Sequence, residues 1–127
     1  MVATLVKQYP KNSLFALEHC NLLKDGGKGP EAISCYQSLL EGAKAGQYAG
    51  AHVEFAAFGL AESLRGQKDY EAALKEYEFT ANVPNGQLSL KQRSELAAGE
   101  MYDLLQKRDL ALAKYQAVLA ADGYPIR

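Results

Sequence analysis

The stretch GEMYDLLQKRDLALAKY, residues 99–115, contains the spacing that decides the fold. Its Ala111 and Tyr115 stand four residues apart, which places both side chains on the same face of a helix. The same Ala-x-x-x-Tyr spacing occurs three times in the chain, at Ala32/Tyr36, Ala73/Tyr77 and Ala111/Tyr115. The alanines recur at intervals of 41 and 38 residues. Self-similarity at such a period predicts one helical unit repeated along the chain.

Around these pairs, apolar residues recur every three or four positions, and proline and glycine separate the apolar blocks. That period is typical of amphipathic helices, and no block alternates as a strand would, so we predict an all-α fold. We expect helices over 14–25, from Pro30 to a loose end at 42–46, and over 51–65, 70–82, 89–105 and 109–121. Asn12 or Ser13, Asp69, and the pair Ser89 and Gln92 are the expected helix caps.

Small residues in the helices before each pair complete the pattern, because they allow two helices to approach closely. They are Cys20 before Leu23, Ala61 before Leu64, and Gly99 before Tyr102. At these residues the chain resembles the tetratricopeptide repeat family, and 99–115 is similar to a bacterial variant of that repeat. The resemblance implies a single domain over 1–127, folded as a right-handed α-α superhelix, a solenoid of three helical hairpins.

The implied repeats span 11–46, 47–86 and 87–122, with short tails at 1–10 and 123–127. The segment Tyr9-Pro10-Lys11-Asn12 resembles the junction between two repeats. Residues 1–10 therefore resemble the end of a preceding repeat, and we expect the sequence to be an excerpt of a longer tetratricopeptide protein.

Composition narrows the range of partners. The 127 residues carry 14 Lys and Arg against 15 Asp and Glu, for a net charge of −1, and the two signs alternate along the chain. No basic arm or acidic tail indicates binding to nucleic acid. The longest apolar stretch without a charge, residues 55–61, is far shorter than the ~20 residues that cross a bilayer, so we expect no membrane insertion. We expect a soluble chain without a secretory signal, and a cytoplasmic location ahead of a periplasmic one.

Candidate catalytic and metal-binding groups are sparse. The soft ligands are two histidines and two cysteines, and adjacent His19 and Cys20 point about 100° apart on a helix, which suits no tetrahedral zinc site. Asp25-Gly-Gly-Lys-Gly29 lacks the strand and the Ser or Thr of a phosphate-binding loop. We therefore expect no enzyme, metal or cofactor. Cys20 and Cys35 are expected in the apolar face of the first hairpin, close enough to cross-link under oxidation but normally reduced.

The family resemblance also implies a site, because the first helix of each tetratricopeptide hairpin lines a concave face that binds ligands. The residues implied to line this peptide-binding groove are Leu17, Glu18, Asn21, Lys24, Phe55, Phe58, Glu62, Arg65, Arg93, Leu96, Glu100 and Asp103. Phe58 and Arg65 are the expected anchors, since aromatic and arginine side chains dominate binding energies. The alternatives are that Phe55 and Phe58 pack against the first repeat and that the charged residues form a solvated face.

The sequence thus predicts a protein–protein interaction module or scaffold that holds a peptide or helix of a partner protein. Glu62 and Glu100 stand where chaperone-tail receptors of the family offer asparagine, which disfavours a carboxylate clamp and favours a partner with some basic character. The alternative function is a structural spacer or self-association segment, with a weak homodimer formed through the exposed repeat ends.

Overall fold

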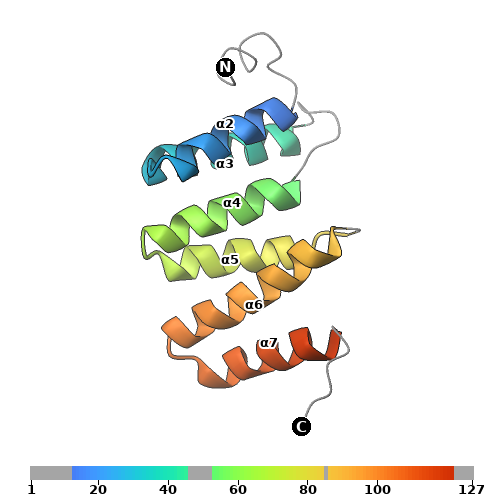
Figure 1. Cartoon of the computed structure of the whole chain (residues 1–127). Coiled ribbons are helices and arrows are strands. Elements are labelled where there is room, and N and C mark those ends of the chain that lie inside the picture. The colour runs from blue at the N-terminus through green and yellow to red at the C-terminus, as the bar shows by residue number, and fades with distance from the viewer. Residues whose placement is uncertain (1–12, 46–52, 85, 122–127) are drawn as a thin grey trace.

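Six α-helices account for almost all of the described chain. The computed structural model describes residues 13–45, 53–84 and 86–121. Its helices are α2 (Ser13–Asp25), α3 (Gly29–Lys44), α4 (Val53–Gly66), α5 (Tyr70–Ala81), α6 (Leu88–Leu104) and α7 (Arg108–Ala121). Figure 1 shows them stacked one after another in chain order. The described residues contain no strand, so the predicted all-α class is confirmed for them.

Local signals in the sequence explain two of the six helix starts, and the expected caps of two other helices are corrected. Pro30 lies in the first turn of α3, where its missing N–H costs nothing, and the Asp69 side chain caps α5 by accepting a bond from the Ala72 N–H, 3.3 Å away. The predicted capping box is wrong, because α6 begins at Leu88 after Gln87 and has no side-chain cap. Ser13 is already helical and so is not the residue before α2.

Several expectations fall on residues that the structure does not describe. These are the tails at 1–10 and 123–127, the cap at Asn12, the boundary between the first two repeats at 46/47, the first two residues of the helix expected from 51, and His52.

Three helix pairs, α2–α3, α4–α5 and α6–α7, are joined by the same turn. Gly27, Lys68 and Gln106 adopt left-handed φ angles of 77°, 64° and 62°. In each turn the next residue donates its N–H to the carbonyl five residues earlier, at 2.9, 3.0 and 2.7 Å. This is the Schellman geometry that ends helices. Each left-handed residue lies five positions before the repeated alanine, so the sequence repeat is also a backbone repeat.

The core lies both within the pairs and between them. One cluster joins α2, α3 and α4 around Tyr36, and a second joins α4, α5 and α6 around Tyr77. Both tyrosines and all three repeated alanines are fully buried. A Cβ on Gly59 of α4 would lie 2.4 Å from the Tyr36 ring, and one on Gly99 of α6 would lie 2.6 Å from Tyr115. Glycines therefore pack closely against aromatic rings both between two pairs and within one, and Gly99 is one of the small residues that the sequence singled out.

The cysteines differ from the sequence-based expectation. Cys20 of α2 and Cys35 of α3 form a disulfide, with their Cα atoms 5.4 Å apart, so the expected proximity is confirmed and the expectation of normally reduced thiols is corrected. Both residues face the shared core of the first pair, and helix packing there brings their Cα atoms within the range that a disulfide spans.

Candidate functional site

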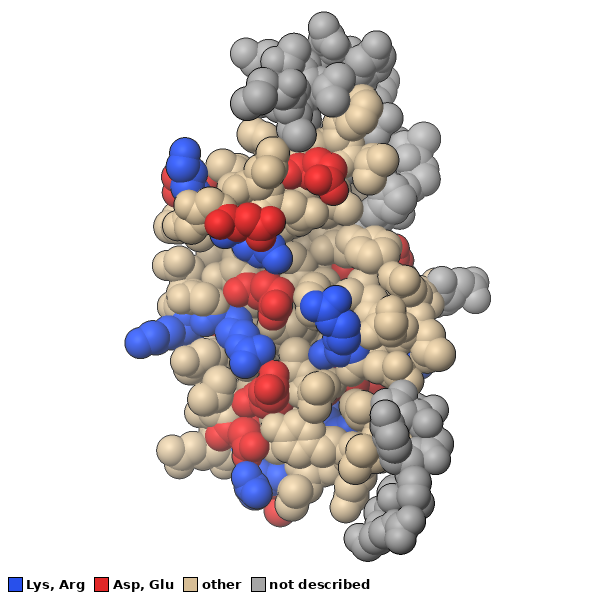
Figure 2. Space-filling view, in the orientation of Figure 1, with Lys and Arg blue, Asp and Glu red and all other residues tan. Residues whose placement is uncertain are grey.

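The twelve predicted groove residues all lie on α2, α4 and α6, the first helices of the three pairs. Figure 2 shows acidic and basic side chains interspersed along one face of the molecule, from the α2 end toward the α7 end. The structure divides the predicted residues into three groups, which are a core residue, a line of internally bonded polar groups and an apolar patch. Only Glu18 and Lys24 fall in none of them, Glu18 being exposed and Lys24 partly buried.

The first group is Leu17, which is buried. Its side chain is 6% exposed and packs in the cluster around Tyr36. A ligand on the helix surface would therefore not reach it, although the resemblance placed it in the groove.

The polar line consists of Asn21, Glu62, Arg65, Glu100 and Asp103, and hydrogen bonds hold each of them. The Tyr36 hydroxyl donates to Asn21, the Tyr77 hydroxyl donates to Glu62, and the Tyr115 hydroxyl donates to Asp103 at 3.2 Å. Each bond connects the second helix of a pair to the first. Arg65 of α4 donates to Glu100 of α6 at 3.1 Å, which links the second pair to the third.

Burial and the neighbouring acids affect the ionisation of these tyrosines. Burial raises the pKa of both Tyr36 and Tyr77 well above the usual range, and the hydrogen bond to Glu62 adds to the effect at Tyr77. Burial also raises the pKa of Tyr115, with Asp103 as the next cause. The hydroxyls therefore stay protonated at neutral pH and serve as hydrogen-bond donors.

The apolar patch consists of the exposed Phe55 and Leu96 and the partly buried Phe58, with Arg93 over the Phe58 ring. Phe55 and Leu96 are 38% and 44% exposed. Phe58 packs against Tyr77 in an edge-to-face arrangement, with ring centroids 5.7 Å apart. The Arg93 guanidinium lies over the Phe58 ring, 4.8 Å from its centroid. Phe58 thus packs in the cluster shared by α4, α5 and α6, whereas the alternative interpretation placed it against the first repeat.

A concavity lies between α3 and α5, where the sequence predicted no site. It has a volume of about 470 Å³, and Leu40, Leu60 and Phe79 provide its apolar lining. Glu76 lies at this cavity, where burial raises the pKa of its carboxyl against the opposing effect of Lys75 and Lys44. The cavity is lined by charges of both signs, because Glu41, Lys44 and Lys75 line it together with Glu76.

Two further observations concern the described residues alone. They contain no group of three or more His, Cys, Asp or Glu side chains placed to hold a metal ion. None of the helices in the described ranges is both long and apolar enough to cross a membrane.

The sequence interpretation missed the tyrosine hydroxyls, because it treated the tyrosines only as space-filling rings. A signal was present, since Asn21 and Glu62 each precede their tyrosine by 15 residues. The third pair departs from that interval, because Tyr115 bonds Asp103, 12 residues earlier.

Comparison with known proteins adds no relative. No protein-family model matches the chain, and neither a curated protein nor a solved structure matches it.

Proposed function

We propose that this chain is a tetratricopeptide-type helical-repeat module that binds a peptide or helix of a partner protein. In this proposal the three helix pairs form a right-handed superhelix, and α2, α4 and α6 line its concave face. Three identical Schellman turns, each followed by alanine and tyrosine at the same positions, support the repeat assignment. The proposal assigns the chain no catalytic step and no cofactor.

The observation that carries the binding role is the patch of Phe55, Phe58, Leu96 and Arg93. Two apolar side chains are exposed beside an arginine that the Phe58 ring orients. Aromatic and arginine side chains at the centre of an interface contribute disproportionately to affinity. The adjacent polar line supplies a rim whose side chains are already ordered by bonds within the protein, which lowers the entropy lost on binding.

The arrangement also changes the choice of anchors. Arg65 is engaged with Glu100, so a ligand that recruits Arg65 must compete with an existing ion pair. Among the described residues, no carboxylate forms an ion pair with Arg93, and its guanidinium lies over the Phe58 ring. The proposed anchors are therefore Phe58 and Arg93 together with Leu96.

The test is capture of a partner from lysate of the source cells, followed by affinity measurement with the isolated partner. Arg93→Ala with Leu96→Ala should weaken binding at least about tenfold. Leu112→Ala on α7 is the matched control, because Leu112 is 42% exposed and Leu96 is 44% exposed. Circular dichroism should show equal helix content in both variants.

The same experiment tests the alternative of a self-association segment. On α7, Leu110, Leu112 and Leu119 are each more than 40% exposed. Leu112 and Leu119 occupy the places of Ile33 and Leu40 in the first pair, where those residues pack against the core shared with α4. If the Leu112 variant loses binding or dissociates a dimer in light scattering while the Leu96 variant does neither, the α7 face is the functional surface.

The cellular location of the protein stays a prediction. The disulfide bears on the choice between the cytoplasm and an oxidising compartment such as the periplasm. Thiols in the cytosol are kept reduced, whereas disulfides persist in secreted and periplasmic proteins. The Cys20–Cys35 bond thus argues for an oxidising compartment over the cytoplasm that the sequence favoured.

A further inference from the structure

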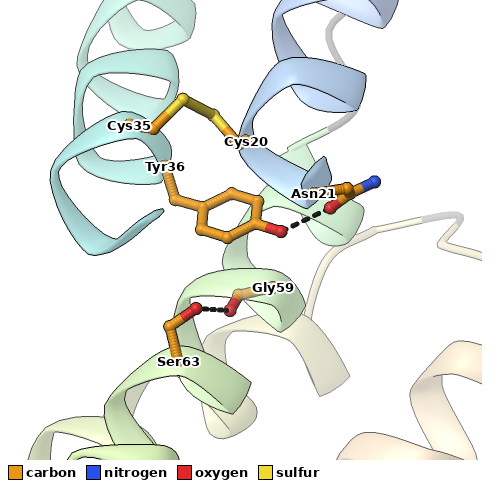
Figure 3. Close-up of a disulfide and its surroundings, with 6 residues drawn as sticks. All are labelled: Cys20, Asn21, Cys35, Tyr36, Gly59 and Ser63. Carbon is orange, nitrogen blue, oxygen red and sulfur yellow. Dashed lines mark hydrogen bonds between the residues drawn. A yellow bond between two sulfur atoms is a disulfide. The ribbon is translucent and has the colours of Figure 1, made fainter. Parts of the chain in front are cut away.

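The Cys20–Cys35 disulfide lies directly beside the first tyrosine hydrogen bond. Asn21 follows Cys20 on α2, and Tyr36 follows Cys35 on α3. Figure 3 shows the disulfide and the Tyr36–Asn21 bond bridging the same two helices, one above the other. The covalent bond therefore fixes the register at which the Tyr36 hydroxyl meets its acceptor.

Tyr36 also contacts the next helix pair, so the register of α3 on α2 determines how the first pair packs against α4. Its ring is fully buried and occupies the space over Gly59 of α4, where no Cβ would fit. The Gly59 carbonyl also accepts a 3.0 Å hydrogen bond from Ser63, which is buried on the same helix. Because interiors are closely packed, a shift of α3 relative to α2 has to displace Tyr36 from this position.

We propose that Cys20–Cys35 is a reversible thiol–disulfide exchange site, and that its redox state sets how firmly the first helix pair holds to the second. The oxidised form locks Tyr36 between Asn21 and Gly59. The reduced form leaves the first pair held by apolar packing and hydrogen bonds alone, so α2 and α3 open more often than the other helices. This inference does not rest on the proposed partner binding.

The two cysteine residues differ in exposure, and this difference proposes a direction for the exchange. Cys20 is 1% exposed, whereas Cys35 is only partly buried. A thiolate of a dithiol reductant attacks Sγ of Cys35, forms a mixed disulfide there and releases the Cys20 thiolate, which takes up a proton. The second thiolate of the reductant then displaces the Cys35 thiolate, so two electrons pass to the protein and the reductant leaves as its disulfide.

Single-cysteine variants test the direction of exchange. Cys20→Ser leaves the Cys35 thiol, and Cys35→Ser leaves the Cys20 thiol, each in a protein of otherwise identical sequence. With glutathione disulfide as the probe, mass spectrometry should show the mixed disulfide forming at Cys35 at least about tenfold faster than at Cys20. Equal rates, or a faster reaction at Cys20, would overturn the assignment of Cys35 as the attacked sulfur.

Hydrogen exchange tests the structural consequence. Dithiothreitol should lower the protection of α2, α3 and the part of α4 around Gly59 by about tenfold or more, and leave α6 and α7 unchanged. The Cys20→Ala, Cys35→Ala variant is the control, and dithiothreitol should not alter its exchange. Unchanged protection on reduction, or an equal loss over all helices, would refute a switch confined to the first pair.

Discussion

Gly59→Ala should destabilise the protein although alanine is the better helix former. An added Cβ at residue 59 would lie 2.4 Å from Cζ, 2.6 Å from Cε1 and 2.7 Å from Oη of Tyr36. Ordinary contacts of this kind are about 3.4 to 4 Å. The Tyr36 ring would have to move by roughly 1 Å, yet it is fully buried and hydrogen-bonded to Asn21.

The two opposing effects can be compared. Alanine gains about 1 kcal/mol over glycine inside a helix. Overpacking a well-filled core costs about 1 to 3 kcal/mol, and a ring that must move this far places the cost at or above the upper end. We therefore expect Gly59→Ala to lower the free energy of unfolding by about 2 kcal/mol, which corresponds to a fall in Tm of roughly 6 to 10 °C for a chain of this size.

Gly66→Ala is the matched control, because it makes the same change in the same helix. A Cβ at Gly66 would meet nothing within 4 Å, so this variant should be unchanged or up to about 1 kcal/mol more stable. Urea unfolding followed by circular dichroism measures both variants, and the slope m should stay constant. If Gly59→Ala proves as stable as Gly66→Ala, the Tyr36 packing described here is wrong. Adding Tyr36→Leu to Gly59→Ala should give a loss smaller than the sum of the two single losses.

Two further predictions concern the tyrosines and the turns. Folding raises the pKa of Tyr36 and Tyr77 above the unfolded value of 10.0, so their contribution to stability is complete below pH 10 and is lost as the pH rises through the folded values. Tyrosinate absorbance at 295 nm should accordingly lag behind that of urea-unfolded protein above pH 10, and Tyr77→Phe should reduce the lag; coincident titrations would contradict the burial of these hydroxyls. Lys68→Gly should stabilise the protein by about 1 kcal/mol in urea unfolding, because it relieves a left-handed φ of 64° in a residue with a Cβ. Gly27→Ala, at a φ of 77°, should destabilise the protein by a similar amount. A neutral result for both variants would refute the shared turn geometry.

The sequence predicted the helices because their apolar residues follow one period over whole turns of helix. Pro30 and Asp69 marked helix starts correctly, since the first turn of a helix tolerates proline and needs an acceptor for its free N–H groups. The predicted cap of α6 was wrong, because Gln87, two residues before Ser89, precedes the helix and makes no side-chain bond to it. A capping residue in the sequence therefore marks a helix start only where its side chain forms a hydrogen bond to the first turn.

The turns were located but their geometry was not predicted. Gly27 signals a left-handed residue, whereas Lys68 and Gln106 adopt the same conformation without any preference for it. Packing of the helix pair imposes that conformation, and such tertiary demands leave no trace in local sequence. The hydrogen-bond partners of the tyrosines depend on the same turn, because the turn sets which residue of the first helix faces the hydroxyl.

The groove residues came from a resemblance, and the structure separates them by what each already contacts. Leu17 lies in the core, and Asn21 accepts a hydrogen bond from the Tyr36 hydroxyl. Phe55 and Leu96, by contrast, are exposed. A helical face predicts the direction in which a side chain points. It does not predict whether a neighbouring helix has already engaged that side chain, since the engagement depends on residues far away in the chain.

The third helix pair shows how one backbone repeat supports different polar surfaces. Asn21, Glu62 and Glu100 each lie six residues before the left-handed residue of their turn, so they are equivalent positions. The first two accept the hydroxyl of their tyrosine, but Glu100 accepts Arg65 from the preceding pair, and Tyr115 turns to Asp103 one helical turn later. Because the alanines, the tyrosine rings and the turns hold the backbone constant, the polar positions can change their partners without altering the fold. Partner selectivity in the proposed module would therefore lie in these exchangeable bonds and in the patch beside Arg93.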